Sequence, residues 1–456
     1  MHPPRLGAAR DAHAALLTDL YQLTMLQAYV REGMGEEAVF DLFVRRLRGR
    51  NYLVACGLDT VLHYLETLRF APEALAYLAT LGLFDEAFLD YLAGFRFEGD
   101  VYAVAEGTPV FPDEPILEVV APIGQAQLVE TYLLNQITFQ TNIATKAHRV
   151  VTAARGRAVA DFGMRRMHGT DAALKAARAA YIAGVASTSN VLAGHIYGIP
   201  VTGTMAHSYV EAHDSEEAAF AAFARLYPGT TLLVDTYDTL AGVRRVVAMA
   251  ERLGAAFQPG ALRLDSGDLA ALAREARRIL DAGGLGHVKL FASNSLDEHA
   301  IADLLAQDAP LDGFGVGTRL GTIADRPYLD TVYKLAEYAG TSRMKLSSAK
   351  SNLPGRKQLF RRFDSSGRAE GDVIALHGED VEGTVLLQKV MAGGARTEAG
   401  RSRSLAVLRD EAADALATLP PPLLALDPAE QAYDVALSSA LRAEAEATRR
   451  RLAELE

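Results

Sequence analysis

Between residues 156 and 340 the chain repeats one pattern, in which a short apolar run ends in polar or glycine-rich residues and a helical stretch follows. The runs are "AVADFG" near 158, "PVTGTMA" near 200, "TTLLVDTYD" near 230, "ALRLDSGD" near 261, "VKLFASNS" near 288 and "GFGVGT" near 313. A spacing of about 20 to 45 residues suits parallel strands joined by crossover helices. The pattern predicts an α/β fold built on an irregular parallel (β/α) barrel, with a doubly wound open sheet as the alternative.

The segments on either side of this region have a different texture. The N-terminal one predicts a helix from Asp11 that stops at Gly33, an alternating strand over "EEAVFDLFVRRL" (36–47), short helices in 58–95, a β segment at 101–122 and a long helix over 124–155. The C-terminal one reads as strands in "KQLFRRFD" and "GDVIALHG" and a final alanine- and arginine-rich helix over about 428–455. We therefore expect an N-terminal α/β segment 1–155, a barrel 156–340, and a C-terminal segment 341–456 that packs with the first to form a flanking α/β domain.

Composition excludes several classes of protein. The net charge of −11 argues against a dedicated nucleic-acid binder, which usually presents a basic face. With Cys56 as its one cysteine, the sequence excludes an internal disulfide and a zinc site built on paired cysteines. It contains neither a signal-peptide core nor a run of about 18 apolar residues, so we expect a cytoplasmic protein with no membrane partner.

The candidate residues follow the apolar runs, because parallel barrels carry their chemistry at the carboxyl ends of the strands. Phe162 and the pair Arg165–Arg166 follow the first run. A guanidinium presents a planar fork that suits a carboxylate or a phosphate, although two solvated arginines at a helix start would look the same. Asp235 follows another run and either orients a histidine, helps to hold magnesium or caps a helix.

Two further strand ends combine charge with small residues. "LRLDSGDL" brings Arg263, Asp265 and Asp268 together, and such groups are costly to leave unpaired in a closed site. "FASNSLDE" supplies Ser293 and Asn294. The glycine run from Gly313 to Thr318 would let a backbone approach an anion at a helix N-terminus, but close barrel packing also selects glycine.

His207 lies at the end of the run near 200, between Thr204 and Ser208. A lone histidine is usually a satisfied core residue, yet neighbouring strand ends offer Asp235 and Arg263, which suits a histidine held by a carboxylate and acting on an anion. The sequence lacks the phosphate-loop and H-E-x-x-H motifs, so an ATP site of that type and a zinc protease site are not expected. The residues alone predict a barrel enzyme for an anionic substrate.

The ordered motifs "LLTDLYQLTM", "FDLFVRRL", "EGTPVFPDEPILEV", "DFGMRRMHG", "ASTSNVLAG", "GTMAHSYV", "LLVDTYDT", "LRLDSGDL", "FGVGT" and "KLSSAKSNLPGRKQLFR" go further. Together, over about residues 16–363, they resemble the nicotinate phosphoribosyltransferase family of type II phosphoribosyltransferases. That family joins nicotinate to 5-phosphoribosyl 1-diphosphate in NAD biosynthesis, and ATP hydrolysis drives the reaction through a transient phosphohistidine. The resemblance implies Mg²⁺ with unassigned ligands, ATP as co-substrate, and a homodimer with a shared active site.

The resemblance also assigns roles. His207 would be the phosphorylated residue, with Asp235, and Asp265 as a second carboxylate, holding the other ring N–H, and Thr204 and Ser208 flanking the substrate. Substrate-binding roles fall to Tyr21 (donated by the other subunit) and Phe162, which would sandwich the pyridine ring, and to Arg165, Ser189, Arg263 and Asn294. The residues that would bind phosphate or diphosphate are Arg46, Gly315, Gly317, Thr318, and the mobile basic loop with Lys345, Lys350 and Lys357.

Several alternatives stay open. Nicotinamide-using relatives carry an aspartate near the position of Ser189, and "STSN" has no carboxylate, which favours the acid over the amide. A nicotinamide phosphoribosyltransferase is therefore the alternative within the group, and quinolinate phosphoribosyltransferase is a shorter relative without ATP coupling. A non-catalytic barrel that binds a nucleotide would bind without turnover, and an aldolase-like lyase would want a strand-end lysine.

Overall fold

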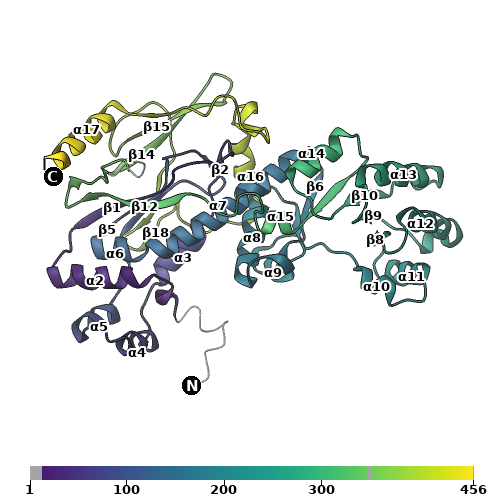
Figure 1. Ribbon diagram of the computed structural model, residues 1–456, viewed down its shortest axis with the longest axis horizontal. Coiled ribbons are helices and arrows are strands. Elements are labelled where there is room, and N and C mark those ends of the chain that lie inside the picture. The colour runs from purple at the N-terminus through teal and green to yellow at the C-terminus, as the bar shows by residue number, and fades with distance from the viewer. Residues whose placement is uncertain (1–12, 347–351, 455–456) are drawn as a thin grey trace. The chain divides into compact units, whose positions relative to one another are not determined.

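The computed structural model describes residues 13–346 and 352–454, which divide into two compact units (Figure 1). Unit 1 comprises Met1–Asn142 and Tyr328–Glu456, and unit 2 is Ile143–Pro327. The long helix α7 (Glu130–Ala153) crosses the boundary between them. The N- and C-terminal segments therefore share one unit, and the central segment forms the other.

Unit 2 is built on a parallel six-stranded sheet with the order β7-β6-β11-β10-β9-β8. Its strands are β6 (Ala158–Asp161), β7 (Ser187–Thr188), β8 (Thr231–Leu233), β9 (Ala261–Leu264), β10 (Lys289–Ala292) and β11 (Gly313–Val316). Its helices are α8 (Thr170–Ile182), α9 (Val191–Tyr197), α10 (His207–Glu211), α11 (Glu216–Leu226), α12 (Thr239–Leu253), α13 (Leu269–Ala282), α14 (Glu298–Ala306) and α15 (Thr318–Gly321), with short 3₁₀ turns η2 (Met164–Arg166) and η3 (Gly254–Ala256). The buried face of α13, rich in alanine, packs on β9 and β10.

The strand order identifies this sheet as an irregular barrel. Its first strand, β6, pairs with its last strand, β11, and β8 to β11 follow in chain order. A doubly wound sheet would not bring the first and last strands together in this way. The ring is incomplete between β7 and β8, where the Thr204 hydroxyl donates to the carbonyl of Thr231 at 2.6 Å. The predicted fold class is confirmed.

One predicted strand of the barrel is wrong. The run near 200 makes only an isolated bridge, from Val201 to Thr188, and β7 takes its place as a strand of 2 residues. Pro200 has no N–H for a ladder, and Gly203 follows closely, so the run cannot sustain strand pairing. It instead forms an extended loop that delivers His207 to the start of α10.

The sheets of unit 1 are mostly antiparallel, and they combine strands from the N-terminal and C-terminal segments. Its seven-stranded sheet has the order β13-β12-β1-β5-β3-β17-β18, a four-stranded sheet has the order β16-β14-β15-β19, and β2 pairs with β4. The strands before the barrel are β1 (Glu37–Val44), β2 (Leu53–Val54), β3 (Asp100–Ala103), β4 (Pro109–Val110) and β5 (Pro115–Pro122). Those after it are β12 (Thr331–Tyr338), β13 (Thr341–Ser342), β14 (Lys357–Phe363), β15 (Ala369–Leu376), β16 (Thr384–Val385), β17 (Gln388–Ala392), β18 (Ala395–Arg396) and β19 (Val435–Leu437). The pairing of β1 with both β5 and β12 joins the two segments in one sheet.

The helices of unit 1 surround an apolar core supplied largely by β1, β5 and α3. They are α2 (Leu20–Glu32), α3 (Leu58–Thr67), α4 (Pro72–Thr80), α5 (Glu86–Ala93), α6 (Ile123–Leu128), α16 (Leu405–Ala417) and α17 (Ser439–Ala453), with 3₁₀ turns η1 (Ala14–Leu16) and η4 (Pro421–Leu424). Helix α2 stops at Gly33 as predicted, because the glycine adopts φ 68°, a left-handed conformation that caps the helix.

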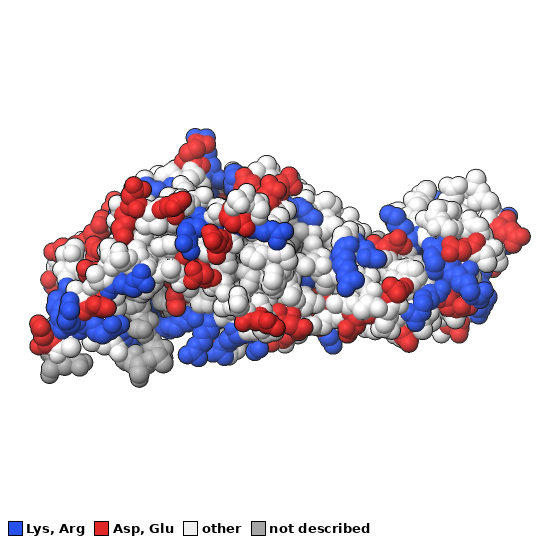
Figure 2. Space-filling view, turned by 90° about the horizontal axis from the view of Figure 1, so that it is seen from above, with Lys and Arg blue, Asp and Glu red and all other residues white. Residues whose placement is uncertain are grey.

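Two predictions for the C-terminal segment need correction. The last helix begins at Ser439 rather than near 428, because the preceding residues pair as β19 with β15. Helix α16 was not predicted from the sequence at all. Basic and acidic side chains are interspersed over the face shown in Figure 2. Among the residues that the structure describes, no helix is both long enough and apolar enough to cross a membrane.

Candidate active site

A cavity of about 800 Å³ opens at the carboxyl ends of the barrel strands in unit 2. Pockets of this size are typical of small-molecule sites. Many of the residues predicted from the sequence line it: Phe162, Arg165, Ser189, Thr204, His207, Ser208, Arg263 and Asp265. The barrel therefore brings together residues that are far apart in the chain, from Phe162 to Asp265.

His207 is partnered on both sides of its ring. Its Nδ1 lies 3.2 Å from the hydroxyl of Thr236, and its Nε2 lies 3.7 Å from Oδ2 of Asp265. The side chain is 40 % exposed, so it is not an enclosed core histidine. The Thr236 hydroxyl can either donate or accept, whereas an ionised Asp265 can only accept, so this arrangement favours a proton on Nε2, facing Asp265, with the Thr236 hydroxyl donating to Nδ1.

Asp265 also holds Arg263. The Arg263 guanidinium donates from Nη2 to Asp265 Oδ1 at 2.9 Å and from Nε to the Ser293 hydroxyl at 2.8 Å. The Ser293 hydroxyl in turn donates to Asp265 Oδ1. The guanidinium carbon lies 5.6 Å from the ring centroid of Phe162, within the range of a cation–π contact. Arg263 is thereby fixed between a carboxylate and an aromatic ring.

Asp235 does not touch the His207 ring, although the resemblance gave it that place. Its Oδ2 accepts from the backbone N–H of Asp265 at 2.8 Å and from the Ser266 hydroxyl at 2.6 Å. The carboxylate is buried and shapes the loop that presents Asp265. Asp265 and Thr236 are thus the groups nearest to the ring, and the structure corrects the sequence on this contact.

The loops after β8 and β9 each contain two aspartates, and the two loops place them in the same way. In each, the first acid lies in the loop, whereas the second, Asp238 or Asp268, caps the next helix by accepting from a backbone N–H. Aspartate is among the best N-cap residues. The capping interpretation thus holds for the second acid of each pair and not for Asp235 or Asp265.

Phe162 is positioned by the residues around it. Its backbone N–H donates to the carbonyl of Val316, and a Cβ on Gly315 would lie 2.6 Å from its ring. Gly315 is buried beneath Phe162, which makes it a packing glycine and corrects its predicted place in a phosphate cradle. Gly317, half-buried, and Thr318, exposed, follow at the start of the short helix α15.

Asp161 ties together two loops that line the cavity. Its carboxylate accepts from Gly163 N–H and from the Thr188 hydroxyl, both at 2.8 Å, and its carbonyl accepts from Ser189 N–H at 2.8 Å. Burial raises the pKa of this carboxyl group, and these hydrogen bonds oppose that rise. The loop of Phe162 and the loop of Ser189 are therefore held in register by one buried acid.

The remaining residues predicted in unit 2 are more exposed. Arg165 projects from η2, and Ser208 stands in the first turn of α10. Asn294 does not line the cavity and has φ 89°, a left-handed conformation that asparagine tolerates. It forms the turn after β10, next to Ser293.

Other predicted residues belong to unit 1. Tyr21 in α2 is 48 % exposed, and its hydroxyl donates to Glu130 at 3.3 Å. Partial burial, followed by the charge of Glu130 and this hydrogen bond, raises the pKa of Tyr21 to about 12. Arg46 is exposed just after β1, and Lys345 is exposed after β13. Lys350 lies outside the described residues.

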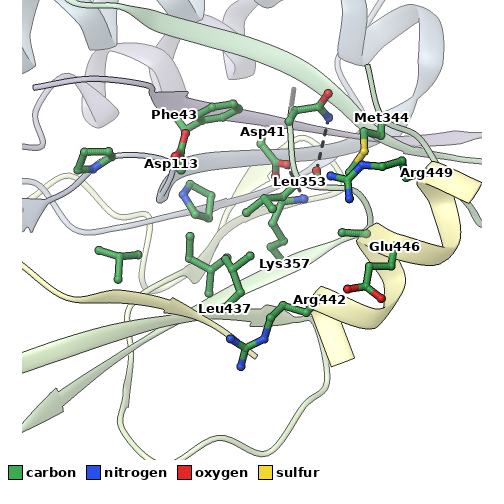
Figure 3. A pocket seen from close by; sticks show the side chains of 16 residues that line it. Asp41, Phe43, Asp113, Met344, Leu353, Lys357, Leu437, Arg442, Glu446 and Arg449 are labelled. Carbon is green, nitrogen blue, oxygen red and sulfur yellow. Dashed lines mark hydrogen bonds and ion pairs between the residues drawn. The ribbon is translucent and has the colours of Figure 1, made fainter. Parts of the chain in front are cut away.

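Lys357 corrects the predicted basic loop. It opens strand β14, is buried, and its ammonium lies 2.7 Å from Asp41 (Figure 3). The ammonium also donates to the carbonyl of Gly355. It borders a cavity of about 410 Å³ in unit 1, with Arg442 and Arg449 of α17 at its rim. A lysine bound to a buried aspartate in a strand is not part of a mobile loop.

The sequence did not single out two side chains, Thr236 and Thr188, that the structure puts beside the candidate residues, and it named Ser293 without giving it a role. Thr236 contacts His207, Ser293 joins Arg263 to Asp265, and Thr188 bonds Asp161. Thr188 ends strand β7, while Thr236 and Ser293 follow strands β8 and β10. Hydroxyl side chains at the ends of strands are also common as caps of the next helix. Only the fold distinguishes the two uses.

A metal site made wholly by the protein is not present among the described residues, since none of their acidic, histidine and cysteine side chains cluster in threes. Mg²⁺ commonly takes only one or two carboxylates and otherwise binds substrate phosphates and water. Asp235 has a buried oxygen, Oδ1, without a hydrogen-bond partner, and Asp265 is 26 % exposed in the cavity. These carboxylates fit a magnesium ion held jointly with a phosphorylated substrate.

Comparison with protein families gives two matches in series. Residues 16–138 match the nicotinate phosphoribosyltransferase (NAPRTase) N-terminal domain, and residues 157–352 match the NAPRTase family. The nicotinate phosphoribosyltransferase pncB2 of Mycobacterium tuberculosis is 53 % identical over 432 residues, or 94 % of this chain and 93 % of that protein. The nicotinate phosphoribosyltransferase of Bacillus subtilis is 44 % identical over 382 residues, covering 82 % and 78 %.

A solved structure supports the same relationship. The crystal structure of human nicotinic acid phosphoribosyltransferase superposes with a TM-score of 0.82 at 30 % identity and covers 94 % of this chain and 99 % of that one. Similarity therefore extends over both units rather than over the barrel alone.

Proposed function

The chain belongs to the nicotinate phosphoribosyltransferase family, and we propose that it forms nicotinate mononucleotide and diphosphate from nicotinate and 5-phosphoribosyl 1-diphosphate. ATP hydrolysis through a phosphohistidine at His207 drives this reaction, which salvages nicotinate for NAD biosynthesis. The observation that carries the proposal is the common cavity of His207, Arg263 and Phe162. It supplies a nucleophile, an anion-binding cation and an aromatic surface at one opening.

The phosphohistidine step uses the two partners of the ring. One imidazole nitrogen attacks the γ-phosphorus of ATP, an N–P bond forms, and the bond from that phosphorus to ADP breaks. The proton on the other nitrogen stays in place, held by Thr236 or by Asp265, whose negative charge also stabilises the cationic ring. Water later cleaves the N–P bond, releasing phosphate and the free imidazole.

Nicotinate is bound at the other side of the cavity. Its flat ring stacks on Phe162, and Arg263 attracts its carboxylate. Ser189 offers a hydroxyl and no negative charge, so a carboxylate is not repelled there. The attacking pyridine nitrogen displaces diphosphate from C1 of the ribose, and fixing both reactants in a cavity supplies much of the rate enhancement for such a displacement.

The phosphate groups need cations and backbone donors. Arg165 lies at the cavity, and Gly317 with Thr318 follows β11 at the same end of the barrel. Arg46 and Lys345 of unit 1 are exposed cations, and we assign them this role from a second subunit. Tyr21 is donated in the same way, as the second face of the pyridine site in a homodimer.

Magnesium, when bound, neutralises charge on the diphosphate leaving group. Asp235 and Asp265 are the residues that would hold it. The chain's own contribution to the departure of diphosphate is to position cationic side chains, above all Arg165, at the cavity.

The test is a direct product assay. Purified protein with nicotinate, phosphoribosyl diphosphate, Mg²⁺ and ATP should release nicotinate mononucleotide and diphosphate, and omission of ATP should slow the reaction. The same assay with nicotinamide in place of nicotinate tests the alternative, since product from nicotinamide would indicate an amide-using enzyme. Binding without product from either pyridine would indicate a non-catalytic protein and overturn the proposal.

A further inference from the structure

Ser293 is a buried hydroxyl beside the cavity that does not itself line it. The residue is 2 % exposed at the end of β10, and its backbone N–H donates to the carbonyl of Leu264 at 2.9 Å, which fixes its position. Its side chain accepts from Arg263 Nε at 2.8 Å and donates to Asp265 Oδ1. One hydroxyl therefore uses both its donor and its acceptor on the charged groups of the site.

Asp265 is divided between two neighbours. Oδ1 binds Arg263 and Ser293, whereas Oδ2 faces His207 Nε2 at 3.7 Å. That distance is too long for a hydrogen bond and short enough for strong attraction between charges. A small rotation of the carboxylate would bring it onto the histidine and weaken its hold on Arg263.

The backbone of Asp265 cannot make this adjustment. Its N–H is bonded to Asp235, which also binds Ser266, the next residue. Movement is therefore confined to the Asp265 side chain, and the Ser293 hydroxyl is the neutral group that restrains it. Arg263, which Asp265 and Ser293 hold in place, in turn contacts the Phe162 ring, with its guanidinium carbon 5.6 Å from the ring centroid.

We propose that Ser293 is a positioning residue that couples the state of His207 to pyridine binding, by holding Asp265 between His207 and Arg263. Positive charge that forms on His207 attracts the Asp265 carboxylate. Because Asp265 is bonded to Ser293 and Arg263, its movement shifts the Arg263 guanidinium beside Phe162, where the pyridine ring binds. Without the hydroxyl, Asp265 turns to His207 independently of Arg263, whose Nε loses its acceptor. The inference rests on the proposed function, because it assigns a role within the ATP-driven reaction.

The test compares Ser293→Ala with wild type by two measurements, the KM for nicotinate and the ATP hydrolysed per nicotinate mononucleotide formed. We expect the KM to rise about tenfold, the size expected on losing a hydrogen bond to a charged group. The ATP ratio should rise about fivefold, the lower end of typical coupling between sites. Ser293→Cys retains the shape with a weaker hydrogen bond and should shift both quantities in the same direction, which covers a poorly folding alanine variant.

Ser295→Ala is the matched control, because Ser295 is exposed in the same loop, and both quantities should stay at wild-type values. An unchanged ATP ratio in both Ser293 variants, with melting temperatures near wild type, would overturn the coupling role even if the KM rose, since a higher KM alone reflects the loss of Arg263 positioning. A wild-type enzyme that forms product without hydrolysing ATP would instead overturn the phosphohistidine proposal, and this inference with it.

Discussion

In unit 1 the pair Arg361–Asp372 is enclosed, with side chains 3 % and 0 % exposed, whereas in unit 2 the pair Arg263–Asp265 opens on a cavity, at 14 % and 26 %. The enclosed pair is bonded to protein groups on several sides. Arg361 binds both Asp372 oxygens and the carbonyl of Pro109, and Tyr433 donates to the same carboxylate. The open pair leaves Asp265 Oδ2 facing His207 without a hydrogen bond.

This difference separates charge used for stability from charge available for chemistry. A buried ion pair without spare bonding capacity has no group to offer a ligand, and its removal leaves an uncompensated charge. A partly exposed pair costs less to desolvate and can exchange partners during a reaction. The two pairs therefore predict opposite responses to substitution.

The largest expected effect is on unit 1. Arg361→Met leaves the Asp372 carboxylate buried without a cation and should lower the free energy of unfolding by about 3–5 kcal/mol. Chemical denaturation measures this loss. Arg362→Met is the control, since its pair with Asp434 is 39 % and 67 % exposed and should be worth less than about 1 kcal/mol. Equal losses would remove the distinction between enclosed and open pairs.

The stability of unit 1 should depend on pH through a second buried cluster of charges, Glu118 with Asp41 and Lys357. Burial, followed by the charge of Asp41, raises the pKa of Glu118 from 4.5 to about 8, with Lys357 and Arg356 opposing the rise. Since the folded state then binds more protons than the unfolded state between pH 4.5 and about 8, stability should fall as the pH rises through that window.

Glu118→Gln removes this titration and should flatten the decline. Denaturation at pH 5 and pH 8 for wild type and variant measures it, with the wild type losing more free energy of unfolding over the interval. Parallel curves would show that Glu118 titrates at its ordinary pKa despite being buried.

Substitution in the open pair, Arg263–Asp265, should change activity rather than stability. Asp265→Asn keeps the shape and removes the charge near His207, and we expect kcat to fall on the order of 100-fold, as for other electrostatic groups in active sites. Its melting temperature should stay within a few degrees of wild type, because solvent reaches the site. A large loss of stability with little loss of kcat would mean that the cavity pair is structural.

Thr236→Val should have the smallest effect. It removes one neutral hydrogen bond to His207, worth about 1 kcal/mol, and should lower kcat roughly fivefold. Thr236→Ser retains the hydroxyl and should stay near wild type. Steady-state kinetics of both variants checks this, and equal activity of valine and serine at that position would show that the hydroxyl contributes nothing.

Much of the barrel was predictable because parallel strands buried on both sides read as apolar runs with polar ends. Strands such as β9 and β10 were found in this way, with Arg263, Asp265 and Asn294 beside them. Strand β7, with 2 residues, is too short to give any periodicity, and the more apolar run near Val201 gives the stronger strand signal.

Side-chain partners were less predictable than positions. Asp235 and Asp265 follow equivalent strands and look alike in sequence, and only the loop geometry turns one to a backbone N–H and the other to His207. Lys357 stands among other basic residues, so the sequence could not reveal that Asp41, from a distant strand, holds it in the interior. Gly315 likewise reads as a phosphate contact until Phe162 is seen above it.

The central claim is that His207 carries a phosphoryl group during the reaction. The most direct measurement is to incubate the protein with γ-labelled ATP and Mg²⁺ and to test for acid-labile, alkali-stable label on wild type and on His207→Ala. We expect label on the wild type alone, and we expect nicotinate with phosphoribosyl diphosphate to discharge it. Folded wild-type protein that stays unlabelled, or equal labelling of His207→Ala, would contradict it.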